Sequence, residues 1–265
     1  MLKVYTLPQI SNRTENKYAE ILSCILDLGE LLLISGAEVM RVEDTIIRLC
    51  MVYGFTKVEV FTIISSIVLT VQNGEGDTLT QTRRIYARDT NLGRVEQVNA
   101  LSRHICANPV SLKTFQQEIK RIRDQKAYSS VSKCLMYAVV SAAFSLFFGG
   151  NFVDSITAAL SGILMFEMFC LCQHLYINGA LKNLLVSILT ALAVLGMVNL
   201  GLGEHPDKII IGNIMLLIPG LALTTSLKDM LHGDTLSGLL GLYEAVLKAL
   251  IVAMGFAVVI ILAGK

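Results

Sequence analysis

The second half of this sequence consists of long apolar segments separated by short polar gaps, and this pattern constrains the fold more than any other feature. Each segment is close to the ~20 residues that an α-helix needs to cross a bilayer. Only 16% of the residues are charged, against about 25% in soluble domains, and most Lys and Arg residues precede Lys133. The pattern predicts a transmembrane domain over 129–265, an all-α bundle of about five helices at 131–148, 155–175, 184–202, 209–227 and 239–263.

The distribution of basic residues predicts how these helices are oriented, because cytoplasmic loops carry an excess of Lys and Arg. Basic residues are dense before the first segment and absent from 149–154. They occur again at Lys182 and Lys228, after the second and fourth segments, whereas the third gap is mixed, with Glu204, Asp207 and Lys208. The first twenty residues lack the apolar core of a signal peptide. We therefore expect a multi-pass protein of the cell inner (plasma) membrane, with a cytoplasmic N-terminus and the C-terminus outside.

The first half predicts a soluble cytoplasmic α+β domain over 17–128, preceded by a mobile leader at 1–16. Apolar residues recur at helical spacing in some segments, whereas others are rich in Val, Ile, Thr and Phe but too short to cross a membrane. The expected elements are helices at 17–34, 37–53, 93–106 and 111–123, strands within 58–71 and 78–88, and a hairpin loop at 73–77.

Several kinds of chemistry find no support in the sequence. The six cysteines do not have the paired spacing of a zinc site. Neither a P-loop, a GxSxG motif nor a dinucleotide fingerprint occurs. The net charge of +1 gives no indication of a nucleic-acid partner. We therefore expect no enzyme activity, no cofactor, no metal site and no nucleic-acid partner.

The fourth apolar segment contains a helix-breaking pair, Pro219 and Gly220. Proline removes a backbone donor and clashes with the preceding turn, and many transporters place a substrate site at such a break. The polar residues around the pair that we take as candidate pathway residues are Asn213, Thr224, Asp229, Asp234 and Glu244. An ordinary packing kink is the alternative for the break, and a turn-capping role is the alternative for Asp234.

Glu167 lies well inside the second apolar segment. A charge at membrane depth costs about 2.5–3.5 kcal/mol on insertion scales, so such a residue usually faces protein or water and marks an ion pathway. We therefore predict a proton-relay role for Glu167. His174 lies two helical turns later on the same face and would extend the relay. A buried structural hydrogen bond is the alternative.

A charge-dense segment at 36–43 begins the second predicted helix, and its candidate functional residues are Gly36, Glu38, Arg41 and Glu43. Glu38 and Arg41 have the i, i+3 spacing of a helical ion pair. The alternative is an ordinary solvated helix face, since exposed ion pairs contribute little to stability.

Two segments resemble the signatures of the threonine/serine exporter family. The segment at 36–43, Gly-Ala-Glu-Val-Met-Arg-Val-Glu, resembles the opening signature. The segment that resembles the second signature contains Ile218-Pro-Gly, then Lys228 through Asp234, then Gly238 and Glu244-Ala. The order of a cytoplasmic domain followed by five spans also matches, and the resemblance covers about residues 17–263. Where many members have an arginine just before the Glu-Ala pair, this chain has Gly241-Leu-Tyr243, so a role for that arginine does not transfer.

The resemblance implies a secondary exporter, driven by the proton-motive force, for small polar carboxylate metabolites. Threonine and serine are the substrates in the family name, and some two-component members are associated with succinate. This chain is similar to the larger, N-terminal half of a split exporter, which implies a small all-membrane partner subunit. A homo-oligomer is another assembly to consider.

The alternative function is a membrane-anchored sensor or scaffold whose cytoplasmic domain binds a ligand or partner. An intramembrane enzyme ranks last, because the sequence pairs no nucleophile with a base at membrane depth.

Overall fold

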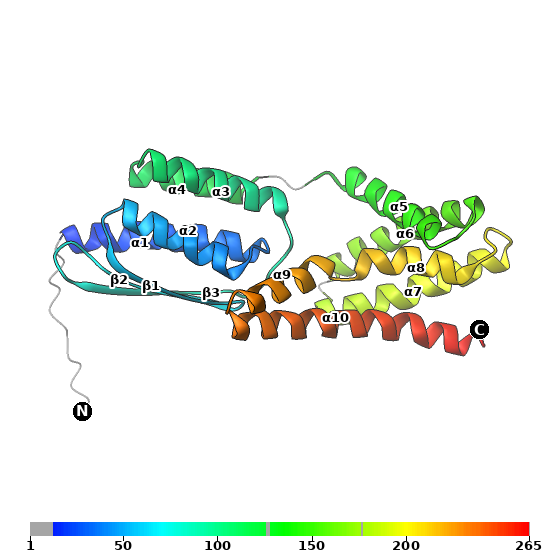
Figure 1. The fold of residues 1–265 in the computed structure, drawn as a ribbon. Helices are drawn as coiled ribbons and strands as arrows, with labels where there is room; N and C mark the ends of the chain where they lie inside the picture. The colour runs from blue at the N-terminus through cyan, green and yellow to red at the C-terminus, as the bar shows by residue number, and fades with distance from the viewer. Residues whose placement is uncertain (1–12, 126–127, 176, 265) are drawn as a thin grey trace, which may run out of the picture. The chain divides into compact units, whose positions relative to one another are not determined.

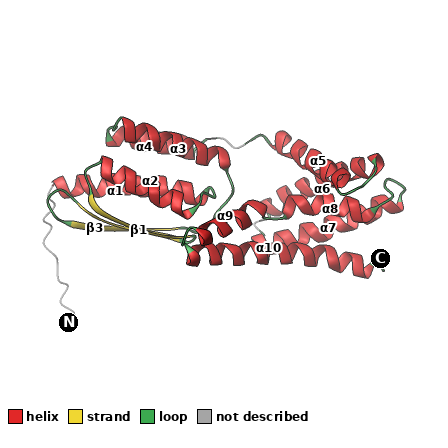
Figure 2. Cartoon of the chain, viewed as in Figure 1, coloured by secondary structure: helices red, strands yellow, loops and turns green. Residues whose placement is uncertain are grey.

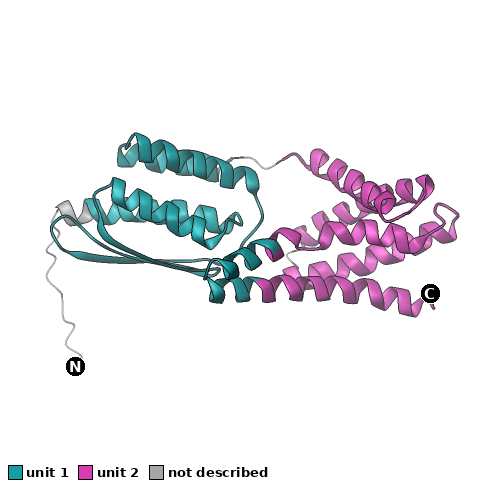
Figure 3. Ribbon diagram, viewed as in Figure 1, with its two compact units in different colours: residues 1–125, 224–241 teal, residues 126–223, 242–265 magenta. Residues whose placement is uncertain are grey.

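The computed structural model describes residues 13–125, 128–175 and 177–264 (Figure 1). Residues 1–12 of the expected leader lie outside the described residues, and helix α1 already begins at Arg13. The chain divides into two compact units (Figure 3). Unit 1 consists of residues 1–125 and 224–241, and unit 2 of residues 126–223 and 242–265. Unit 1 therefore contains a stretch from the apolar half of the chain.

The N-terminal part of unit 1 combines helices with a small antiparallel sheet, in the α+β order that the sequence predicts. Its elements are α1 (Arg13–Ile34), α2 (Val39–Val52), β1 (Thr56–Ile63), β2 (Ser66–Gln72), β3 (Thr78–Arg84), α3 (Leu92–Ala107) and α4 (Leu112–Arg123). The strands pair in the order β1-β2-β3. The apolar run at 58–71 holds parts of two strands, because the chain reverses between the paired residues Ile63 and Ser66.

The core of unit 1 lies between the sheet and the helices, and Figure 2 shows α1 to α4 on the same side of the strands. Along β2, alternate residues are fully buried, namely Ile67, Leu69 and Val71, as expected of a strand with one face on a core. Helix α1 contacts the sheet as well as α2, α3 and α4. It is accordingly buried around most of its circumference, which explains why it is so apolar.

The described residues of unit 2 form helices and the turns between them. The helices are α5 (Ser130–Phe147), α6 (Phe152–His174), α7 (Gly179–Asn199) and α8 (Pro206–Leu217), and both units share α9 (Gly220–Leu231) and α10 (Thr235–Leu262). In the described part of the chain, α5, α6, α7 and α10 are long and apolar enough to cross a membrane. Helices α8 and α9 pass the same test together but are bent by 52° at the break between them. The candidate spans therefore number four, or five if the bent pair is one span, and the bend falls at the predicted helix-breaking pair.

Glycine residues allow α5, α6 and α8 to pack closely. A Cβ atom added at Gly162 in α6 would lie 2.8 Å from the carbonyl oxygen of Tyr137 in α5. One added at Gly212 in α8 would lie 2.5 Å from the carbonyl oxygen of Ser141, also in α5. Close backbone approach at small residues is a main source of helix association in lipid, where the hydrophobic effect is absent.

A buried amide joins the same three helices. Asn213 in α8 is fully buried. Its side chain accepts a hydrogen bond from Ser141 Oγ at 2.7 Å and donates to Ser161 Oγ in α6 at 2.7 Å and to the Ile209 carbonyl oxygen at 3.0 Å. These bonds satisfy a polar group that would be costly to bury alone.

The packing at Gly212 gives a prediction for stability. Gly212→Ala should destabilise the bundle by about 1–3 kcal/mol, the usual cost of overpacking, because the added methyl group has no room beside α5. The measurement is thermal unfolding of the purified, detergent-solubilised chain, followed by size-exclusion chromatography.

Gly196→Ala in α7 is the matched control, because nothing lies within 4 Å of the Cβ position there. Alanine is a better helix former than glycine by about 1 kcal/mol, so this variant should keep or raise the melting temperature. Equal melting of the two variants would contradict the close approach of α5 and α8.

Candidate functional site

The first signature segment begins helix α2, and its first helical amide is capped by a residue from far along the chain. Glu38 occupies the N-cap position of α2, but its side chain makes no capping hydrogen bond. Instead, the Val39 N–H donates to Oδ1 of Asp229 at 3.0 Å. Asp229 is buried and lies in the part of α9 that belongs to unit 1. A carboxylate at a helix N-terminus satisfies an unpaired donor and interacts favourably with the helix dipole.

An ion pair lies beside this cap. Lys228 Nζ approaches Glu38 Oε1 at 2.9 Å. The hydrogen bond from Lys228 holds the pKa of Glu38 below its usual value. The Glu38–Arg41 pair expected from the i, i+3 spacing also forms, but at 3.5 Å, so Lys228 is the closer partner of Glu38. Adjacent residues of α9 therefore contact adjacent residues at the start of α2.

Glu43 connects the same helix to the sheet. Its Oε1 accepts a hydrogen bond from the N–H of Thr62 in β1 at 2.8 Å. Burial raises the pKa of Glu43, and the negative charge of Asp234 raises it further, although the hydrogen bond from Thr62 opposes both effects. Glu38, Val39 and Glu43 of this segment thus make contacts within unit 1, whereas Met40 and Arg41 are exposed.

Gly36 forms the turn that places this segment. Its φ of 87° lies in the left-handed region that glycine adopts at little cost. The N–H of Ala37 donates to the carbonyl oxygen of Leu32 at 3.1 Å, which closes the end of α1. A residue with a Cβ at this position would strain the turn between α1 and α2.

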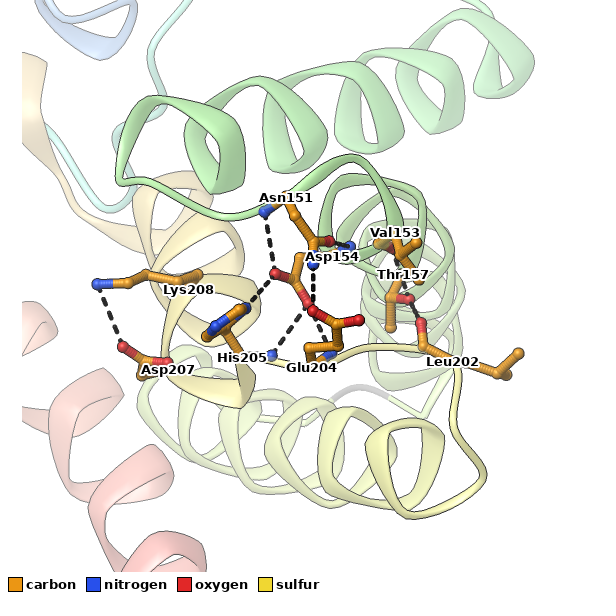
Figure 4. A network of polar contacts seen from close by, with 9 residues as sticks. All are labelled: Asn151, Val153, Asp154, Thr157, Leu202, Glu204, His205, Asp207 and Lys208. Atoms are coloured by element: carbon orange, nitrogen blue, oxygen red, sulfur yellow. Dashed lines mark hydrogen bonds and ion pairs between the residues drawn. The ribbon is translucent and has the colours of Figure 1, made fainter.

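A second polar cluster, shown in Figure 4, lies in unit 2 at the start of α6. The Asp154 side chain is fully buried. It accepts hydrogen bonds from the backbone N–H of Asn151 (3.0 Å), Glu204 (2.8 Å) and His205 (3.0 Å), and it contacts His205 Nδ1 at 2.8 Å. The Asn151 side chain in turn caps α6 by accepting from the Asp154 N–H. Asp154 therefore fastens the loop between α7 and α8 to the start of α6.

Asp154 and His205 are absent from the predicted site residues. The signal for Asp154 is visible in the sequence, because Asn151 and Asp154 have the spacing of a capping box. Nothing local indicates the bonds to the loop at 204–205. We interpret the role of this cluster as structural. Every described contact of Asp154 either caps α6 or joins Asp154 to the loop backbone or to His205.

The structure places the remaining predicted residues in different settings. Asn213 is buried at the contact of three helices, whereas Glu167 is exposed on α6, Thr224 on α9 and Glu244 on α10. Pro219 and Gly220 lie at the break between α8 and α9. Thr224, Asp229 and Asp234 belong to unit 1, like the first signature segment, and Asp229 contacts that segment directly. In the described residues, no three His, Cys, Asp or Glu side chains are placed to hold a metal ion.

Comparison with known proteins identifies the family. A family model described as "Putative threonine/serine exporter" (ThrE) matches residues 23–263. The chain belongs to the threonine/serine exporter family. This confirms the resemblance seen in the two signature segments and makes the chain a multi-pass membrane protein of a transporter family. No match was found among curated proteins or among solved structures.

Two of the contacts in unit 1 join residues of the two signature segments of the threonine/serine exporter family. The residues that carry the two signatures are far apart in the sequence, and Val39–Asp229 and Glu38–Lys228 bring them together. Lys228 and Asp229 of the second signature therefore form one structural site with Glu38 and Val39 of the first, at the end of α9 and the start of α2.

The cap gives a prediction for local stability. Asp229→Ala should leave the Val39 N–H without its acceptor, at a cost of about 1–3 kcal/mol for a buried unsatisfied donor. Amide hydrogen exchange at the start of α2, measured by mass spectrometry on the full chain, should become about tenfold faster or more.

Asp229→Asn is the matched control, because it removes the charge but keeps a carbonyl oxygen as acceptor. Its exchange rate should lie closer to that of the wild type. Unchanged exchange in Asp229→Ala would show that this contact does not hold α2.

The setting of Glu43 gives a prediction for pH dependence. Because its folded-state pKa is raised above the ordinary 4.5, the folded state binds this proton more tightly than the unfolded state. The contribution of Glu43 to stability therefore falls as the pH rises from about 4.5 through the raised pKa. Glu43→Gln removes this titration and keeps an acceptor for Thr62, so it should gain stability relative to the wild type as the pH rises from 4.5 to 7.

Thermal unfolding at several pH values measures this effect. Glu59→Gln, at an exposed position of β1, is the control and should follow the wild-type curve. A Glu43→Gln curve parallel to the wild type would contradict the raised pKa.

Proposed function

We propose that this chain is a secondary, proton-coupled exporter, or the larger subunit of one, for small polar carboxylate metabolites such as threonine, serine or the dicarboxylate succinate. The main observation that supports this proposal is the 52° break between α8 and α9. The second half of the broken helix, α9, also caps α2 through Asp229. Broken membrane helices are tolerated where protein or a water-filled cavity satisfies the backbone, and transporters bind substrates at such breaks. Membership in the family supports the substrate class.

The contacts of α9 suggest how the cytoplasmic part takes part in transport. Helix α9 begins at the break, and near its end it contacts Val39 and Glu38. A packed helix moves as a stiff element, so a shift at the start of α2 would tilt α9 and alter the break. In this proposal, the cytoplasmic part gates the pathway instead of serving as an anchor.

Glu167 is the proposed proton carrier. It is exposed on α6, and its side chain makes no hydrogen bond or ion pair with the described residues, so a buried structural hydrogen bond does not account for it. The cost of a charge at membrane depth supports a functional role. Thr224 and Glu244 are retained as pathway candidates on the basis of their positions next to the break and in α10.

The proposal includes the setting of the chain. We place it in the inner membrane with the N-terminus in the cytoplasm and the C-terminus outside, which the distribution of Lys and Arg supports. A small all-membrane partner subunit is supported by the resemblance to the larger half of split exporters. The chain is proposed to have no enzyme activity.

A sensor is the second candidate function, and one observation favours it. A cleft of about 590 Å³ lies beside α3 and α4 and is lined by polar residues that include His104, Thr114, Glu118 and Arg121. This volume falls in the range of small-molecule sites. A sensor would bind a metabolite there and would not move it across the membrane.

Efflux from preloaded cells distinguishes these functions. Cells that express the chain, with and without the small partner subunit, should lose threonine, serine or succinate faster than control cells. Glu167→Gln should abolish the pH-dependent part of this efflux at equal expression, because an amide cannot carry the proton.

Glu75→Gln, at an exposed position of the hairpin loop, is the control and should leave efflux unchanged. Normal pH-dependent efflux in Glu167→Gln would remove the proton-carrier role. Absence of efflux for all three solutes, together with metabolite binding that Arg121→Ala abolishes, would favour the sensor.

A further inference from the structure

A second cleft of unit 1 lies between α1 and α4, two helices that contact each other. Its volume is about 290 Å³, close to the lower limit of small-molecule sites, which span about 300–1,000 Å³. A metabolite of a few heavy atoms therefore suits it better than a nucleotide. We call it the α1–α4 cleft, and its lining includes Cys24 and Asp27 of α1, Ile119, Lys120 and Arg123 of α4, and Asp124 directly after α4.

The floor of the α1–α4 cleft is uncharged. Cys24 and Ile119 are buried, with exposed fractions of 2% and 5%, whereas the charged residues from α4 are exposed. Burial raises the pKa of the Cys24 thiol, so this thiol stays protonated at neutral pH. The buried side chains thus form a neutral surface, and the charged ones lie around the opening.

Two cations at the opening have no counter-ion among the described residues. Lys120 and Arg123 lie one turn apart on one face of α4, and neither side chain makes a hydrogen bond or ion pair within the described part of the chain. Arg121, in the same turn, does pair with Glu118 at 2.8 Å. The helix dipole favours basic residues in a last turn, but like charges one turn apart repel each other. An anion bound between Lys120 and Arg123 would relieve this repulsion.

The same opening carries two carboxylates. Oδ1 of Asp27 accepts hydrogen bonds from Nε and Nη2 of Arg83, both at 3.0 Å, whereas its Oδ2 accepts none from the described residues. Asp124 is the C-cap residue of α4, and its side chain has no partner in the described ranges. A carboxylate oxygen with a vacant lone pair can accept from an ammonium group. The cleft therefore offers acceptors for a cation beside donors for an anion.

We propose that the α1–α4 cleft binds a free α-amino acid as its zwitterion, with the carboxylate between the two unpaired cations and the ammonium group facing Asp124. The two charged groups of an α-amino acid are separated by a single carbon atom, and the unlike charges of Arg123 and Asp124 are likewise adjacent in the chain. A short side chain lies on the neutral floor. Phosphate or a dicarboxylate would bring a second negative charge next to Asp124, which disfavours both.

A site in unit 1 gives this unit a way to respond to an amino acid. In the orientation of the proposed function, the N-terminal part of the chain lies in the cytoplasm, so the cleft would report the internal amino-acid concentration. This role rests on the proposed function. The binding site itself does not, because it is built from residues of unit 1 and requires no transport.

Amide hydrogen exchange of the purified full chain, measured by mass spectrometry during a serine titration, tests the site. Serine at about ten times its dissociation constant should slow exchange over 116–124 about tenfold, because it stabilises the closed form of the segment that it binds. Serine methyl ester lacks the carboxylate and N-acetylserine lacks the ammonium group. Each should need at least about tenfold more ligand for the same protection, the usual order of loss for a charge-assisted hydrogen bond.

Charge-removing variants locate the binding. The double variant Lys120→Gln/Arg123→Gln should raise the serine midpoint at least tenfold and keep the wild-type melting temperature, because both side chains are exposed. Lys113→Gln/Arg121→Gln is the matched control: it removes the same charge from α4 at positions that do not line the cleft, so its midpoint should be unchanged. Asp124→Asn should weaken protection by serine but not by N-acetylserine.

The remaining outcomes overturn the proposal. Absence of protection by serine, or equal protection in Lys120→Gln/Arg123→Gln, would leave no amino-acid site in this cleft. Protection by N-acetylserine equal to that by serine would indicate a site for carboxylates alone, and equal protection by phosphate or succinate would indicate a general anion site. Efflux is measured separately. A chain that exports serine without this protection loses the cleft site but remains an exporter, and protection without efflux gives the reverse.

Discussion

The hydrogen bond from the Val39 amide to the Asp229 carboxylate is the contact on which the organisation of unit 1 depends. Helix α2 begins without a side-chain cap of its own, so its first turn is completed by a residue of α9. Glu38 and Lys228 add an ion pair beside the cap. Helix α9, which starts at the break after α8, therefore ends as part of unit 1, and the proposed gate follows from this arrangement.

Most of the fold could be predicted from the sequence because most of its signals are local. Helical periodicity located α3 and α4 to within one residue at either end. The hairpin at 73–77 follows from Asn73, whose side chain accepts hydrogen bonds from the N–H groups of Glu75 and Asp77. The break before α9 follows from the chemistry of proline. In each case the residues that determine the structure lie within one or two turns of it.

The candidate site could be predicted only in part because its contacts are long-range. Sequence spacing pairs Glu38 with Arg41, but the closer partner, Lys228, belongs to another part of the chain. The same limit applies in unit 2, where no local pattern indicates that Asp154 binds the loop at 204–205. Residue type alone also left the setting of Asn213 and Glu167 undetermined, since one is buried between helices and the other is exposed.

The discontinuity of unit 1 has a consequence for how the protein is made. Residues 224–241 belong to this unit but follow α5 to α8 in the chain. During synthesis, which proceeds from the N-terminus, the start of α2 has neither its cap nor its ion-pair partner until the ribosome has produced six later helices, α3 to α8. A chain that stops before residue 224 lacks Lys228 and Asp229 and so leaves α2 without its cap. Completion of unit 1 thus depends on residues that follow α5 to α8, and a truncated product differs from a finished one at the first turn of α2.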